Sequence, residues 1–156
     1  MTLPSNWNPL FSKSVRLAFP SSLHEKATSL CRRSKDESGQ SRLPQNSPFE
    51  RMVDLWMLCV IIGRAEGRFE PDVELKEFIG GDIFHGDMTR ISIALAIALA
   101  HENNDISVLD DAKKILTICN GYAAGGLPII LEAADSGASK TIENIYKSIT
   151  SGDLSF

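Results

Sequence analysis

One apolar stretch, residues 47–67, restricts the folds open to this chain more than any other segment. Ser47, Pro48 and Glu50 have the spacing of a helix start: a capping serine, a proline in the first turn and a glutamate three residues later. The residues that follow are apolar almost without interruption, and Gly67 stands where a helix can end. A helix that is apolar on nearly every side must be enclosed by other helices. The stretch therefore predicts an all-α fold built around it.

A second apolar helix is predicted over residues 88–102, with Asp87 as its N-cap. Within it, Ala94 and Ala98 lie one turn apart, and small residues at this spacing let a neighbouring helix approach closely. The length and alanine content of the segment favour a helix over a buried strand. Together the two segments predict a compact multi-helix bundle around two largely apolar central helices.

The remaining apolar patterns predict shorter helices around these two. We expect them at residues 21–33, 71–79, 107–124, 127–134 and from 139 onward. The pairs Gly80-Gly81 and Gly125-Gly126 are interpreted as helix ends.

The domain organisation predicted from composition is simple. Residues 1–20 hold three prolines and are expected to form an irregular or partly extended N-terminal arm. Residues 21–156 are expected to form a single helical domain, in which the serine-rich segment 34–47 is a flexible loop. The longest apolar run is about half the length that spans a bilayer, so we expect no transmembrane helix. With no signal-peptide pattern at the N-terminus, we expect a cytoplasmic protein.

The sequence offers no recognisable catalytic, cofactor or metal site. It contains no glycine-rich nucleotide loop, no GxSxG and no HExxH motif, and its three histidines are far apart. Three cysteines without CxxC spacing are expected to be buried apolar residues. Cys31 alone, beside two arginines, is a minor candidate for a thiol with a lowered pKa. We therefore predict no catalytic residues, no cofactor and no metal.

Charge is distributed unevenly along the chain. Residues 1–68 carry ten Lys/Arg and six Asp/Glu, a net charge of +4, whereas residues 69–156 carry six and fourteen, a net charge of −8. The basic residues gather around the serine-rich segment and the first central helix, and such a set can contact phosphates or an acidic protein. The predicted nucleic-acid or partner-binding residues are Arg32, Arg33, Lys35, Arg42, Arg51, Arg64 and Arg68.

A family resemblance lies in residues 93–126, whose sequence is IALAIALAHENNDISVLDDAKKILTICNGYAAGG. They combine an alanine-rich apolar helix, an acidic turn, a helix around Lys113-Lys114 and a Tyr-Ala-Ala-Gly-Gly ending. This segment, with DLWMLCVIIGRAEG at residues 54–67, resembles a small family of proteins associated with DNA phosphorothioation (Dnd-type) restriction systems. The resemblance implies an accessory component of a prokaryotic anti-phage system that works with larger DNA-processing subunits. It implies no catalytic residues.

Three functional hypotheses follow. The first is a non-enzymatic adaptor of a DNA-modification or restriction defence system, which acts through contacts with larger subunits and has possible contact with DNA. The second is a DNA-binding transcriptional regulator, and the third is a small nuclease or hydrolase with an unrecognised site. The sequence does not fix the oligomeric state, and no membrane partner is expected.

Overall fold

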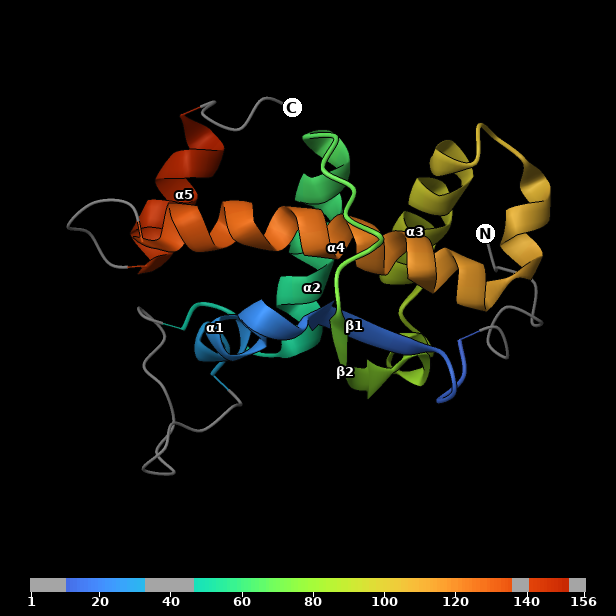
Figure 1. The fold of residues 1–156 in the computed structure, drawn as a ribbon, viewed down its shortest axis with the longest axis horizontal. Coiled ribbons are helices and arrows are strands. Elements are labelled where there is room, and N and C mark those ends of the chain that lie inside the picture. Colours follow the sequence, from blue (N-terminus) through green and yellow to red (C-terminus); the bar gives the residue numbers. More distant parts are fainter. Residues whose placement is uncertain (1–10, 33–46, 136–140, 152–156) are drawn as a thin grey trace.

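The computed structural model describes residues 11–32, 47–135 and 141–151, and shows a mostly helical fold with one small sheet. Helix α4 runs across the whole molecule, α2 crosses it, α3 packs beside one half of it and α5 packs near its C-terminal end (Figure 1). The α-helices are α1 (His24–Ser29), α2 (Met52–Ala65), α3 (Met88–His101), α4 (Ala112–Asp135) and α5 (Thr141–Thr150). Short 3-10 turns lie at Ser21–Leu23, Gly81–Phe84 and Ile106–Asp110.

The start of α2 differs from the prediction. The helix begins at Met52, and its N-cap is Arg51, whose backbone N–H donates to Oδ2 of Asp54 at 3.2 Å. The predicted cap, Ser47, is instead buried, and its hydroxyl donates to the carbonyl oxygen of Ser29 at 2.7 Å. This bond holds the chain leading into α2 against the end of α1, so the serine serves tertiary packing rather than helix capping.

The crossing of α2 and α4 depends on two glycines. A Cβ placed on Gly63 would lie 2.0 Å from the carbonyl oxygen of Tyr122, and one on Gly126 would lie 1.9 Å from that of Cys59. The two helix backbones therefore touch, as small residues at a crossing allow. The prediction that Gly125 and Gly126 end a helix was wrong: α4 continues through both of them and through Pro128 to Asp135.

A two-stranded antiparallel sheet makes the fold mostly helical rather than all-α. Strand β1 (Arg16–Pro20) pairs with β2 (Leu75–Gly80), with a register irregularity after Leu17. The prediction of helical turns over residues 71–79 was therefore wrong. The rings of Phe19 and Phe78 stack across the sheet at 5.3 Å. Pairing with β1 and this cross-strand contact outweigh the local helix propensity of the segment.

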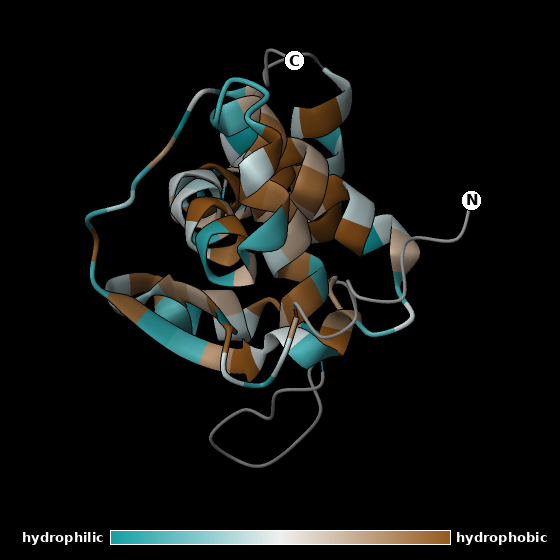
Figure 2. Cartoon of the chain, turned by 90° about the vertical axis from the view of Figure 1, so that its right-hand side faces the viewer, coloured by the Kyte–Doolittle hydropathy of each residue, from teal (hydrophilic) through white to brown (hydrophobic). Residues whose placement is uncertain are grey.

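The core lies between the sheet and the crossing helices. Phe11, Leu17 and Phe19 from the predicted N-terminal arm are fully buried with Trp56 of α2. Figure 2 shows hydrophobic ribbon concentrated where the helices meet in the middle of the molecule. Among the described helices, α4 alone is long and apolar enough to span a membrane by composition. Its apolar window is 72% buried inside the fold, however, which accounts for that composition.

Helix α3 begins as predicted. Asp87 is its N-cap, and Oδ1 of Asp87 accepts from the backbone N–H of Arg90 at 3.1 Å. The Arg90 guanidinium also pairs with Oδ2 of Asp87 and with Oδ1 of Asp54. Since Asp54 is in the first turn of α2, this network ties the starts of the two predicted central helices together.

Candidate functional site

Four of the seven predicted basic residues, Arg32, Arg51, Arg64 and Arg68, lie in the described part of the chain. Arg51 precedes α2 and pairs with Asp54 at 3.2 Å, and the hydrogen bonds that its guanidinium donates to this carboxylate raise the pKa of Arg51. Arg64 and Arg68 lie at the other end of α2, which spans 14 residues and so about 20 Å. Arg32 is half-buried, and its backbone N–H donates to the carbonyl oxygen of Phe49. Arg32 and Arg51 therefore lie toward the start of α2, and Arg64 and Arg68 lie at its end.

The other three predicted residues, Arg33, Lys35 and Arg42, lie outside the described residues, as does segment 34–46 of the predicted loop. The set of seven remains a prediction as a binding surface.

Arg64 belongs to an aromatic cluster at the ends of α2 and α3. Its guanidinium lies 5.7 Å from the ring centroid of Tyr122, the geometry of a cation–π contact. The Tyr122 hydroxyl and Nδ1 of His101 are hydrogen-bonded at 2.8 Å, and the Phe69 ring packs against both rings. Tyr122 is buried, so the cluster is a packing feature with an arginine on its outside.

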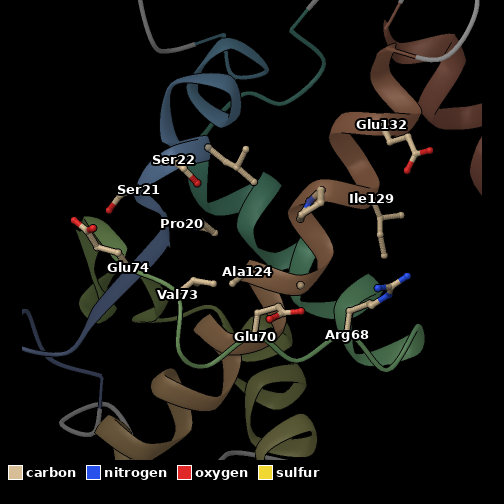
Figure 3. Close-up of a pocket in the computed structure, with 13 residues that line it drawn as sticks. Pro20, Ser21, Ser22, Arg68, Glu70, Val73, Glu74, Ala124, Ile129 and Glu132 are labelled. Carbon is tan, nitrogen blue, oxygen red and sulfur yellow. The ribbon is translucent and has the colours of Figure 1, made fainter.

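A pocket of about 520 Å³ lies between the end of β1, the 68–74 connection and the second half of α4, and we call it the α4 pocket. Its apolar lining residues are Pro20, Leu23, Val73, Ala124, Gly125, Pro128 and Ile129. Its polar lining residues are Ser21, Ser22, Arg68, Glu70, Glu74 and Glu132. Figure 3 shows the polar side chains spread around the pocket: Glu74 and Ser21 on one side, Arg68 and Glu70 at one end, and Glu132 on α4.

Backbone contacts fix the 68–74 wall of the α4 pocket. Gly67 has φ +64° and follows α2, where its N–H donates to Arg64 O and the Arg68 N–H donates to Gly63 O. These two bonds form a Schellman motif, which confirms Gly67 as the predicted residue just past the helix end. The Glu70 N–H then donates to Gly121 O at 3.0 Å, and the Ser21 N–H donates to Glu74 O at 2.8 Å.

Two residues inside α4 shape the other wall. A Cβ on Gly125 would lie 2.0 Å from the carbonyl oxygen of Arg68, so the glycine lets the 68–74 connection lie directly on the helix. Pro128 has no N–H to donate to the carbonyl oxygen of Ala124, four residues earlier in the helix. The wall therefore includes a backbone acceptor that has lost its usual helical donor.

The charges around the α4 pocket are not neutralised within it. Glu70, Glu74 and Glu132 are exposed, and among the described residues none of them forms an ion pair or side-chain hydrogen bond. Three glutamates and one arginine give the lining a net charge of −2. An open, partly apolar pocket with unpaired carboxylates can bind a cationic group that also carries apolar surface.

The described part of the chain contains no arrangement that we recognise as catalytic. Neither Ser21 nor Ser22 is hydrogen-bonded to a carboxylate, and no histidine lines the α4 pocket. Within residues 11–32, 47–135 and 141–151, no group of three or more His, Cys, Asp or Glu side chains could hold a metal ion. In this part of the chain, no serine, cysteine or threonine is therefore seen beside a base that would activate it as a nucleophile.

Fold and pocket together define a small, mostly helical protein with an open, partly apolar pocket between β1 and α4. Comparison with known families agrees with a supporting role. Residues 31–154 match the model of DNA sulphur modification system-associated protein 4, and the chain belongs to this Dnd-associated family. No curated protein and no solved structure matches the chain. The family membership confirms the predicted resemblance to phosphorothioation-system proteins.

The carboxylates of the α4 pocket were not predicted from sequence. Glu70 and Glu74 lie in an acidic segment without any recognisable motif, and Glu132 lies about 60 residues further along the chain. Only the packing of the 68–74 connection on α4 brings them together. Pro128 lies at the start of the helix predicted over residues 127–134, and that prediction concealed the continuation of α4 through the proline.

Proposed function

We propose that this protein is a non-enzymatic adaptor of a DNA sulphur modification and restriction system, working in the cytoplasm. In this proposal it binds one of the larger subunits of the system through the α4 pocket. Membership of a system-associated family supports the accessory role. The observation that carries the binding role is the open α4 pocket, with its apolar lining and three unpaired carboxylates.

Within the part of the chain that the structure describes, the placement of three of the predicted arginines favours protein contact over direct DNA contact. Arg51 is paired with Asp54, Arg64 lies over Tyr122, and Arg68 shares the α4 pocket with three glutamates. Phosphate binding requires several cations on one face, free of competing carboxylates. The DNA-binding regulator is therefore the weaker hypothesis.

Reconstitution with purified components tests the adaptor proposal. The full-length protein is mixed with each larger subunit of the sulphur modification system of the same host, and complexes are separated by size-exclusion chromatography. We expect one stable complex, formed without added DNA. Elution of the protein apart from every subunit, or a complex that requires a DNA duplex, would contradict the proposal.

A further inference from the structure

The α4 pocket presents acceptors at several separate points rather than at one. Glu70 and Glu74 come from the 68–74 connection and Glu132 from α4. Among the described residues they do not belong to any group of side chains close enough to share a metal ion. A single cation therefore cannot satisfy all three carboxylates. Several cationic groups spaced along one peptide chain can pair with the three carboxylates separately.

The length of the pocket sets the size of such a chain. Glu132 is eight residues after Ala124, which places it about 12 Å further along the axis of α4. An extended peptide advances about 3.3 Å per residue, so about four residues cover this distance. Two lysine or arginine side chains within a short extended segment can thus reach opposite ends of the α4 pocket.

Apolar residues lie between these acceptors. Val73 is 38% exposed and lines the pocket from the 68–74 connection, and Ile129 lines it from α4 (Figure 3). Covering them removes apolar surface from water, which is favourable for an aliphatic side chain placed between two cations.

We propose that the occupant of the α4 pocket is an extended protein segment in which two or more Lys or Arg residues flank an aliphatic residue. The inference rests on the adaptor function proposed above and names the chemistry of its partner. Charge complementarity is the main argument, because a lining with a net charge of −2 repels nucleic acid and acidic peptides and attracts basic ones. Arg68 is the exception in the lining, and it weakens the attraction at its own end.

A matched pair of charge reversals tests the inference on the full-length protein. The pocket variant is Glu70→Lys/Glu132→Lys. The control is Asp110→Lys/Glu143→Lys, which changes the net charge equally at exposed positions outside the α4 pocket. The probes are immobilised peptides of about 15 residues, tiled through the larger subunits of the same system and long enough to fill the pocket in extended form.

We expect the peptides that bind to contain at least two Lys or Arg beside Leu, Ile, Val or Met. The pocket variant should bind them at least tenfold more weakly, and the control should stay within about twofold of the unaltered protein. Val73→Ser should weaken binding about fivefold through the lost apolar contact. Arg68→Glu should strengthen it about threefold, the opposite of its effect on any DNA-binding surface.

The results separate the inference from the adaptor function on which it rests. If the full-length protein binds a subunit and the pocket and control variants bind equally well, the inference is wrong and the adaptor function stands. If Arg68→Glu weakens binding, or if the binding peptides lack basic residues, the charge argument fails. If no subunit binds the unaltered protein, the adaptor function itself fails.

A DNA duplex of about 20 base pairs serves as the nucleic-acid probe. Tight binding of this duplex that is lost in Arg68→Glu would identify the α4 pocket as a nucleic-acid site instead.

Discussion

At the scale of single residues, the buried side chain of Asn120 connects three elements of the fold. It is 7% exposed. Its Oδ1 accepts from Trp56 Nε1 and from the backbone N–H of Ala18, each at 3.0 Å, and its Nδ2 donates to Arg16 O at 3.1 Å. The amide thus occupies the free edge of β1 in place of a third strand. It joins the sheet, α2 and α4.

Replacing this amide should be costly, because it leaves buried groups without partners. Asn120→Ala leaves the Trp56 indole N–H and two backbone groups without hydrogen-bond partners. We therefore expect the free energy of unfolding to fall by about 2–4 kcal/mol in urea titrations. A double-mutant cycle with Trp56→Phe isolates the bond to the indole. If Asn120→Ala unfolds at the same urea concentration as the unaltered protein, Asn120 does not organise the sheet edge.

At the scale of elements, the contact between α2 and α4 depends on the absence of side chains. In an exposed helix, replacing glycine with alanine raises stability by about 1 kcal/mol. At Gly126 the added methyl would meet the backbone of Cys59, so we expect Gly126→Ala to lower the free energy of unfolding by about 1–3 kcal/mol. Thermal unfolding followed by circular dichroism measures the change.

Two further variants check this interpretation. Gly63→Ala introduces a methyl at the same crossing, so the double variant should lose less stability than the sum of the two single losses. Thr117→Ala, on the exposed side of α4, should change the free energy of unfolding by less than about 0.5 kcal/mol. A stabilised Gly126→Ala protein would mean that the two helices are further apart than described.

The network at the starts of α2 and α3 predicts a pH dependence of stability. The backbone N–H of Arg90, together with its guanidinium, lowers the pKa of Asp87 below its ordinary value of 3.8, against the opposing effect of burial. A carboxyl with a lower pKa in the folded state than in the unfolded state stabilises the fold above its ordinary pKa. This contribution disappears as the pH falls through the lowered value.

Comparison of the unaltered protein with Asp87→Asn measures this contribution, because asparagine keeps the cap and loses the charge. At pH 7 the variant should be less stable by about 0.5–1 kcal/mol. The difference should shrink as the pH falls below 3.8 and vanish once Asp87 is protonated in the folded protein as well. Urea titrations from neutral to acidic pH follow it, and a difference that is constant with pH would rule out a role for the charge.

At the scale of the whole molecule, three buried thiols report on the integrity of the core. Cys31, Cys59 and Cys119 are thiols rather than halves of disulfides, and each is at most 1% exposed. Burial raises the pKa of Cys119 to about 12 and raises that of Cys59 as well, so both thiols stay protonated at neutral pH. The thiolate is the reactive form, and burial also blocks reagents.

Labelling of the native protein with a thiol reagent at pH 8 should therefore be slow at all three cysteines. The labelling rate should rise with urea in step with unfolding, since the transiently open state reacts. Mass spectrometry of peptides assigns each label, and labelling in concentrated guanidinium chloride provides the complete-reaction control. Rapid labelling of Cys31 alone in the native protein would contradict this prediction and support the hypothesis that Cys31 is a reactive thiol.

The sequence by itself determined the helical class, the helix over residues 88–101, the end of α2 at Gly67 and the family. These depend on the period of apolar residues, on capping chemistry and on local turns, which neighbouring residues encode. Only the tertiary structure decided that residues 75–80 form a strand, that α4 passes through Gly125, Gly126 and Pro128, and that Glu70 and Glu132 line one pocket. The reason is physical: strand pairing and backbone contact between α2 and α4 outweigh local propensities, and they join segments that are far apart in the chain.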